Sequence, residues 1–380
     1  MKDLFITKVR IEKVRHLSNI DLALSDTERK HLILAGKNGS GKTSLLEAMK
    51  DNILYFQRPI TTPVILVNGL RSEYCNIEHS GLEIFYSHSE LYLSNCIISY
   101  IPVERSKFVL PDTIVPVNIE GRTLISQNLS KDFLKYILNL DYQLYGAKTD
   151  KNEMLVSNLS KWFDDFVSAL REIYACKELE LQRDAKNLTF KITMPDREPF
   201  GLNEMADGYA AFLEIYLELL MRFEFENAMV DYNTPAIILI DEIETHLHVE
   251  LQKRVLPFLT KMFPNVQFIV STHSPFVMTS LDNAVVFDLE KKERLERPSF
   301  YSYDTVVESF LETSMYSHEL IKRFARYKEL CLKERTSEED EEFLIVKAEL
   351  EIRMIPSTEL YIAFQNLEKA RKAVKNDTSI

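Results

Sequence analysis

One short glycine-rich stretch constrains this chain more than any other feature of its sequence. Residues 36–43 read G-K-N-G-S-G-K-T and follow directly on the apolar run H-L-I-L-A. The chain has only 9 glycines, and Gly36, Gly39 and Gly41 lie within this stretch. Glycine costs backbone entropy on folding, so such a cluster needs a structural reason. A surface turn is one reason, and a loop whose backbone wraps a phosphate is the other.

The context of the stretch favours the phosphate. Its spacing fits G-x-x-x-x-G-K-[ST], and a buried strand precedes it while a helix is predicted from Ser44 to about Gln57. Backbone N–H groups converge on a phosphate only where side chains are absent, and the helix points its positive end at the same anion. The residues expected to bind the nucleotide are Gly36, Asn38, Gly39, Ser40, Gly41, Lys42, Thr43 and Ser44.

Two later stretches supply the acids and the histidine that such a loop needs. In A-I-I-L-I-D-E (236–242), Asp241 ends a buried strand and is expected to join Thr43 as a Mg²⁺ ligand. Glu242 beside it is placed to polarise a water molecule. In S-T-H-S-P (271–275), His273 stands at the carboxyl end of the next strand, where ligands collect in open α/β sheets. The sequence therefore predicts ATP and Mg²⁺ as ligands, with Glu242 and His273 as catalytic residues.

Apolar strands alternating with helices predict an α/β fold with a mostly parallel sheet and an N-terminal antiparallel β subdomain. Residues 161–174 read as an amphipathic helix, and residues 179–194 as two strands around a polar turn. Charged helices are expected at the end, where Leu360, Phe364 and Leu367 share one face after a Ser357 cap. The expected division is 1–58 and 201–300 for the ATPase, 59–200 for an inserted α+β region and 301–380 for a helical tail.

The composition excludes several classes of function. A net charge of −12 argues against a chain coated in nucleic acid, but it leaves a local basic groove open. No apolar stretch approaches the roughly 18–20 residues that a membrane span needs, and the N-terminus lacks the apolar core of a signal peptide. The cysteines show no metal or disulfide spacing; they are Cys75, Cys96, Cys176 and Cys331. We therefore expect a reduced, cytoplasmic protein without membrane contact.

Together these residues resemble the ABC-type ATPases, in the branch of the SMC proteins and the overcoming-lysogenization-defect (OLD) family. The resemblance covers residues 1–58 and about 200–290. It rests on G-K-N-G-S-G-K-T, on I-I-L-I-D-E, on E-T-H-L-H, which resembles the D-loop of that branch, and on S-T-H-S-P, which resembles its His switch. Y-I-P-V-E-R (100–105) is similar to a strand-and-arginine segment of stand-alone members. The Q-loop stays unassigned, because Gln57 follows the phosphate loop too soon and Glu104–Arg105 is the other candidate.

The resemblance implies a homodimer or higher oligomer in which each chain supplies half of each active site. A signature loop, here L-N-E-M-A-D-G-Y (202–209), grips the γ-phosphate held by the other subunit. Its expected nucleotide contacts are Ala206, Asp207 and Gly208. Ala206 replaces the usual serine and removes a hydroxyl, so we expect a slow ATPase. His246 and His248 lack a third metal ligand nearby, and a loop crossing the dimer interface suits them better than zinc.

The leading functional hypothesis is an ATPase of DNA metabolism or antiphage defence, similar to Septu, retron-associated and OLD-like systems. The tail after Phe300 lacks the acidic D-x-D cluster of a Toprim nuclease, so we expect the effector, a nuclease or toxin, to be a separate protein. Two alternatives stay open. A transporter's cytoplasmic ATPase subunit is disfavoured by the altered signature loop, and a non-hydrolysing scaffold is disfavoured by the intact Glu242. An SMC-like bridging machine would need a coiled-coil arm. Binding of nucleic acid stays open.

Overall fold

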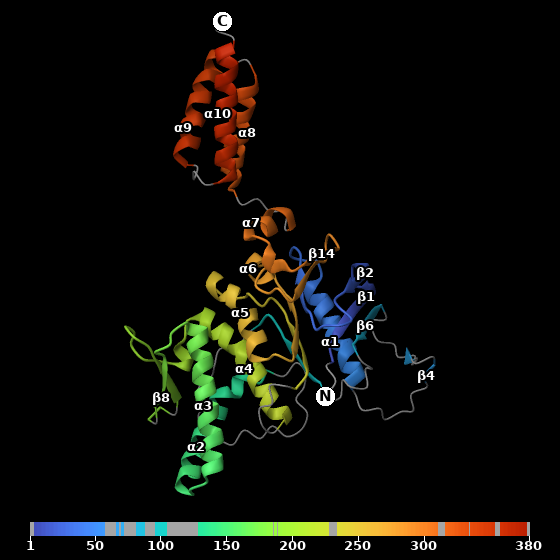
Figure 1. Ribbon diagram of the computed structural model, residues 1–380, viewed down its shortest axis with the longest axis vertical. Helices are drawn as coiled ribbons and strands as arrows, with labels where there is room; N and C mark the ends of the chain where they lie inside the picture. Colours follow the sequence, from blue (N-terminus) through green and yellow to red (C-terminus); the bar gives the residue numbers. More distant parts are fainter. Residues whose placement is uncertain are drawn as a thin grey trace. The chain divides into compact units, whose positions relative to one another are not determined.

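A mostly parallel six-stranded sheet lies at the centre of the first of two units, residues 1–306 (Figure 1). Its strand order is β14–β13–β3–β12–β11–β7, and only β14 runs antiparallel to its neighbour. The strands are β3 (His31–Ala35), β7 (Ile97–Ile101), β11 (Ala236–Ile240), β12 (Val266–Ser271), β13 (Ala284–Asp288) and β14 (Glu293–Glu296). Every residue of β3, β11, β12 and β13 is buried, as a sheet covered on both faces requires. The predicted fold class is confirmed.

The computed structural model describes most of the chain. The described residues are 4–57, 66–67, 70–71, 81–87, 96–104, 128–184, 186–187, 189–227, 234–310, 316–333, 335–353 and 358–377. Cys75, Arg105 and Ser357 of the sequence analysis lie outside these ranges. The side chain of Gln57 is likewise not described.

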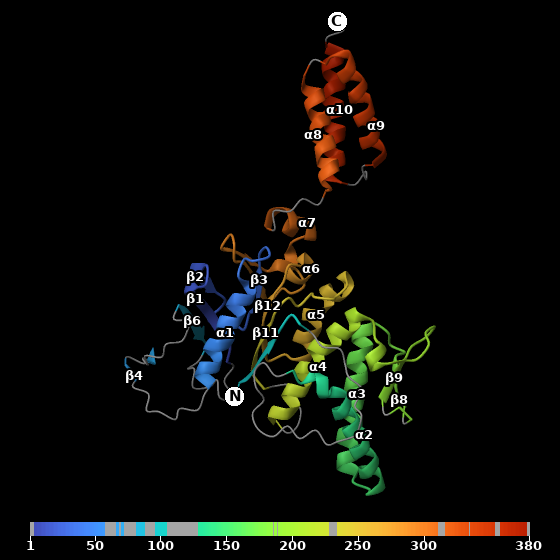
Figure 2. The ribbon, with the colours of Figure 1, turned by 180° about the vertical axis from the view of Figure 1, so that it is seen from behind.

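The predicted antiparallel β subdomain is present, and helix α1 (Lys42–Gln57) lies beside the central sheet in both ribbon views (Figure 2). The subdomain has the order β2–β1–β6, and its strands are β1 (Ile6–Val14), β2 (Leu17–Ala23) and β6 (Leu82–Tyr86). Leu45, Leu46 and Met49 of α1 are fully buried in the core cluster shared by both sheets. The side chain of Gln267 on β12 also makes two hydrogen bonds to the main chain of Ile6 on β1. Its Oε1 accepts from Ile6 N at 2.7 Å, and its Nε2 donates to Ile6 O at 2.9 Å.

A helical region includes the long helix that begins within residues 202–209. It contains η2 (Ser130–Asp132), α2 (Phe133–Thr149), α3 (Glu153–Tyr174), η3 (Leu202–Glu204) and α4 (Asp207–Asn227). A small antiparallel sheet is formed by β8 (Glu180–Asp184), β9 (Thr189–Thr193) and β10 (Phe200–Gly201), and a short pair by β4 (Leu66–Val67) and β5 (Leu70–Arg71). The helix predicted at 161–174 lies within α3, and the two strands predicted at 179–194 are β8 and β9.

The remaining helices of the first unit follow the sheet strands. They are α5 (Val249–Met262), α6 (Pro275–Met278), η4 (Pro298–Phe300) and α7 (Tyr303–Thr305), and a π-helix, η5 (Val306–Phe310), crosses the boundary. Strands β6 and β7 belong to sheets of this unit although the chain places them within residues 59–200. The domain boundaries proposed from the sequence therefore stay predictions.

In the second unit, residues 307–380, the described residues form helices α8 (His318–Leu332), α9 (Ser337–Arg353) and α10 (Glu359–Asp377). The helices pack around Tyr327, Phe343 and Phe364. The centroid of the Tyr327 ring lies 5.4 Å from that of Phe343 and 4.9 Å from that of Phe364. Leu360 and Leu367 pack against this cluster together with Phe364, as their spacing predicts. The tail is helical, as expected from the sequence.

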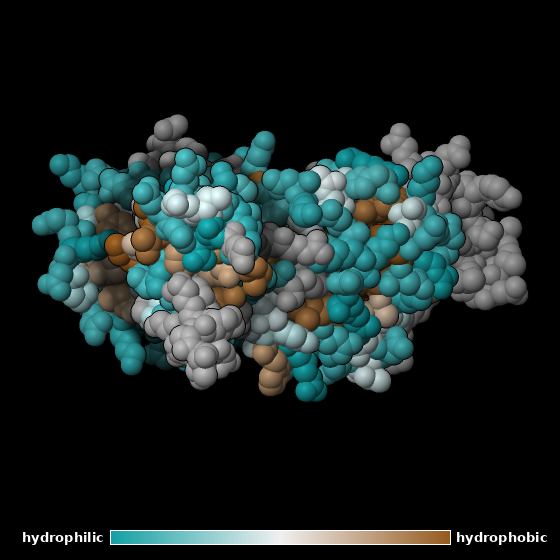
Figure 3. Space-filling view, turned by 90° about the horizontal axis from the view of Figure 1, so that it is seen from above, coloured by the Kyte–Doolittle hydropathy of each residue, from teal (hydrophilic) through white to brown (hydrophobic). Residues whose placement is uncertain are grey.

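The surface agrees with the charged composition of the chain. Figure 3 shows a face on which hydrophilic side chains predominate and hydrophobic ones form scattered patches. Within the described ranges, no helix has both the length and the apolar character needed to cross a membrane.

Candidate nucleotide-binding site

The phosphate loop, residues 36–43, joins buried strand β3 to helix α1. Its glycines have the backbone angles φ = 134° at Gly36, 82° at Gly39 and 100° at Gly41, which side chains rarely permit. A Cβ atom at Gly36 would stand 2.6 Å from Ser40 Oγ, and one at Gly41 would stand 3.1 Å from the His16 ring. Conformation and close approach therefore both require glycine at 36 and 41, whereas at Gly39 only the backbone conformation does.

Lys42 is buried at the start of α1 and folds back over the loop. Its Nζ donates to the carbonyl oxygens of Gly36 at 2.9 Å and Lys37 at 3.1 Å. Burial lowers the pKa of Lys42, while the charges of Glu242, Glu244 and other nearby acids oppose that change. Neighbouring Ser40 has a buried Oγ without a hydrogen-bond partner among the described residues. The loop thus holds an ammonium group and a free hydroxyl, which suit phosphate oxygens.

Asp241 stands at the end of β11 and is only 1% exposed. Its Oδ1 accepts a 2.5 Å hydrogen bond from Ser271 Oγ on neighbouring β12. Its Oδ2 is buried and has no hydrogen-bond partner within the described part of the chain. An orphaned buried carboxylate oxygen is costly unless a cation or proton compensates it. Together with the exposed Thr43 hydroxyl, this donor set fits Mg²⁺, which prefers oxygen ligands.

Glu242 and His273, the two residues predicted to be catalytic, lie next to each other. Glu242 Oε1 is 3.9 Å from His273 Nε2, and the carboxylate also accepts from Thr245 Oγ1 at 3.4 Å. The Glu242 backbone has a positive φ of 44° and is held by its N–H, which donates to Ser271 Oγ at 2.7 Å. Such strain persists only where the surroundings impose it, and it clusters at functional sites. The carboxylate is partly open to solvent and can reach a water.

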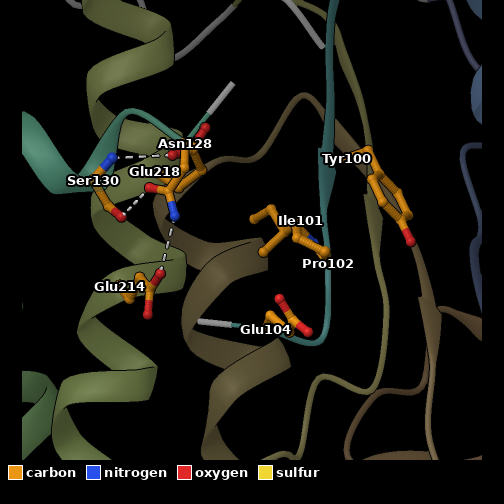
Figure 4. Close-up of a pocket in the computed structure, with 8 residues that line it drawn as sticks. All are labelled: Tyr100, Ile101, Pro102, Glu104, Asn128, Ser130, Glu214 and Glu218. Atoms are coloured by element: carbon orange, nitrogen blue, oxygen red, sulfur yellow. Dashed lines mark hydrogen bonds between the residues drawn. The ribbon is translucent and has the colours of Figure 1, made fainter. Parts of the chain in front are cut away.

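The parallel pairing of β7 with β11 brings the end of β7 to the same edge of the sheet. Asp241 N donates to Ile101 O at 2.9 Å, so Glu104 follows close to the acidic site. A small cavity of about 30 Å³ lies between this segment and α4, and Glu104, Glu214 and Glu218 line it (Figure 4). Glu104 thus follows the strand that pairs with β11, and the assignment of the Q-loop stays a prediction.

The signature loop forms a separate group. Gly208 lies in the first turn of α4, and a Cβ there would stand 3.1 Å from His246 O and 3.2 Å from His248 Cδ2. The side chains of His246 and His248 are exposed. Tyr209 stacks on Tyr174 with ring centroids 4.2 Å apart. The structure thus groups the phosphate loop with Asp241, Glu242 and His273, whereas Gly208 packs against the two histidines.

Two residues near the phosphate loop, Arg15 and His16, were missed by sequence reasoning. Arg15 Nη1 donates to Ser44 Oγ at 2.9 Å, and Nη2 pairs with Glu47 at 3.2 Å. The neighbouring His16 lines a hollow of about 420 Å³ beside the loop, together with Lys37, Asn38, Gly39, Ser40, Glu290 and Lys292. The available signal was the position of R-H in the turn after the first strand.

These features define a P-loop nucleotide-binding site. Residues 126–279 match a family model described as "AAA domain, putative AbiEii toxin, Type IV TA system". The chain is 31% identical over 412 residues to the retron Vc95 probable ATPase of Vibrio cholerae serotype O1 biovar El Tor, covering 81% of this chain and 80% of that protein. The chain therefore belongs to the family of P-loop ATPases that contains this retron protein.

Two further similarities accompany that match. The Septu protein PtuA of Bacillus mycoides (strain KBAB4) is 25% identical over 313 residues, covering 77% of this chain. The chain spans less than half of that protein's length, 42%. Among solved structures, the SMC head domain from Thermotoga maritima matches with a TM-score of 0.38 and 14% identity, covering 74% of this chain and 94% of the head domain.

Proposed function

We propose that this chain binds ATP with Mg²⁺ and hydrolyses it slowly to ADP and phosphate. On nucleotide binding, Lys42 would exchange the carbonyl oxygens of Gly36 and Lys37, to which it now donates, for phosphate oxygens. Thr43 and Asp241 hold the cation, which neutralises phosphate charge when bound. The hollow beside His16 accommodates the nucleoside end of the substrate.

The hydrolytic step is assigned to the two residues that stand 3.9 Å apart. Glu242 accepts the proton of the attacking water, because its carboxylate is partly open to solvent and its backbone is fixed by Ser271. His273 contacts the γ-phosphate through Nε2, which is buried and without a hydrogen-bond partner in the described chain. A water molecule attacks in line when a proton acceptor, here Glu242, and a group that contacts the γ-phosphate, here His273, are held close together.

We propose further that two chains close head-to-tail around two ATP molecules. Residues 206–208 would then reach the γ-phosphate bound by the other copy, with the start of helix α4 directed at it. The exposed His246 and His248, packed against Gly208, would lie at the junction of the two copies. ATP would act as a switchable clamp, because only the triphosphate bridges both subunits.

We infer that the clamp controls a separate effector, a nuclease or toxin, in an antiphage defence system of the cytoplasm. The Septu and retron names of the related proteins support this inference. The effector would dock on the region within residues 59–200 or on helices α8–α10. The test is affinity capture of the Glu242→Gln form, held with ATP, from the native host. Recovery of a nuclease or toxin encoded beside this chain supports the inference, and recovery of neither overturns it.

The observation that carries the ATPase proposal is the convergence of Lys42, Asp241, Glu242 and His273 at one edge of the sheet. The test is phosphate release by purified protein, with Glu242→Gln and Lys42→Ala as variants. Turnover below about 10 per second is expected, the median for enzymes being near that rate. Glu242→Gln should bind ATP without releasing phosphate, and Lys42→Ala should not bind. Normal turnover in either variant would refute the assignment.

A further inference from the structure

The seven-residue segment from Glu242 to His248 touches three parts of the site that the chain places far apart. At its start, Glu242 N–H donates to Ser271 Oγ on β12. In its middle, the Glu244 carboxylate accepts a hydrogen bond from the backbone N–H of His273. At its end, His246 O and the His248 ring lie against Gly208 at the start of α4. One short segment thus connects the catalytic carboxylate, the histidine and the signature loop.

Glu244 makes the central contact of this segment. Its Oε1 accepts a short hydrogen bond from the backbone N–H of His273. Its Oε2 is buried and has no hydrogen-bond partner among the residues that the structure describes. A carboxylate that accepts from a backbone N–H makes a stronger bond than a neutral acceptor would. The bond therefore fixes the main chain of His273 rather than its ring.

We propose that Glu244 is a positioning residue that holds His273 at the γ-phosphate and ties it to the loop carrying His246 and His248. This inference rests on the proposed ATPase function. The backbone of Glu242 has its own anchor in Ser271. Removal of the Glu244 side chain therefore leaves the Glu242 carboxylate in place and removes only the hydrogen bond to His273. Movement of the loop against Gly208 is passed to the His273 main chain through this bond, next to the bridge that Gln252 makes between Leu247 O and Ser274 Oγ. The proposed role of Glu244 is to act through His273 rather than by contact with ATP or Mg²⁺.

The experiment compares Glu244→Ala with Glu244→Gln in the full chain, and Glu180→Gln serves as a control at an exposed site of β8. The alanine form should keep its affinity for a fluorescent ATP analogue within about twofold, while kcat falls by about tenfold to a hundredfold. The glutamine form should recover most of that kcat, because its amide oxygen still accepts the His273 N–H. The control should behave as wild type.

A second measurement tests the contact without requiring turnover. Hydrogen–deuterium exchange at the His273 amide should be slow in wild type and Glu244→Gln, and at least about tenfold faster in Glu244→Ala. Equal exchange in all three forms overturns the proposal. An unchanged kcat in Glu244→Ala also overturns it. So does a Glu244→Gln form whose kcat is as low as that of the alanine form, since the charge of Glu244 and not its hydrogen bond would then be responsible. A wild type without turnover would refute the ATPase proposal, while exchange would still decide the contact.

Discussion

Replacement of Glu224 by glutamine should stabilise the first unit, and the gain should grow with pH. Glu224 lies on α4 and is 8% exposed. Its Oε1 accepts from Trp162 Nε1 on α3, while Oε2 has no hydrogen-bond partner within the described ranges. Burial raises the pKa of Glu224 to about 8 from an ordinary value of 4.5. Glutamine keeps an oxygen for Trp162 and cannot ionise.

The sign and size follow from proton linkage. The folded chain holds the Glu224 proton up to about pH 8, whereas the unfolded chain releases it near pH 4.5. The folded state therefore binds more protons between these values, and stability falls as pH rises through the window. At about 1.4 kcal/mol for each pKa unit, the penalty grows to on the order of 5 kcal/mol above pH 8. Wild type and Glu224→Gln should converge below about pH 4.5.

The chain offers a convenient assay, because Trp162 is its only tryptophan. Urea unfolding of both forms is followed by its fluorescence between pH 5 and 8.5. Asp165 is exposed on α3, the helix that carries Trp162, and Asp165→Asn serves as the control for loss of a charge. A stability difference of Glu224→Gln that stays constant across this pH range would refute the reasoning, because it would mean that the buried carboxyl group does not titrate as described.

Three further substitutions test the site. Ser271→Ala removes the donor to Asp241 and should raise the Mg²⁺ concentration for half-maximal turnover about tenfold, and an unchanged Mg²⁺ dependence would contradict this. Gly36→Ala places a Cβ 2.6 Å from Ser40 Oγ at a φ of 134°, so ATP binding measured by calorimetry should be lost; binding at wild-type affinity would argue against a wrapped phosphate. His16→Ala opens the hollow and should raise KM for ATP several-fold with kcat unchanged, whereas an unaltered KM would remove the nucleoside from that hollow.

The elements of the site could be predicted because each carries its signal locally. The glycine spacing predicts a phosphate loop, and the short apolar run A-I-I-L-I between polar segments predicts a buried strand. Strand β11 accordingly begins and ends at the predicted residues, 236 and 240. Helix α1 begins at Lys42, two residues before the predicted start, since its first turn is part of the phosphate loop.

The roles of Arg15, Ser271 and Glu244 could not be predicted, because each depends on a contact between distant segments. Arg15 reads as one more cation in a charged strand until the turn brings it to Ser44. Ser271 belongs to the quoted S-T-H-S-P stretch, but its partners Asp241 and Glu242 are set by the neighbouring strand. Periodicity shows which face of a strand is buried and says nothing about which strand lies beside it.

The geometry of the site therefore depends on the register of three parallel strands. Ile240 pairs with Val270, and Ser271 pairs with Leu34, so the ends of β11, β12 and β3 reach the same edge of the sheet. Thr272 N then donates to Leu34 O at 3.0 Å and holds the chain before His273 next to the strand that leads into the phosphate loop. A slip of one residue would turn Ser271 to the opposite face, away from Asp241. The register of β11, β12 and β3 therefore fixes where the acids, the histidine and the phosphate loop meet.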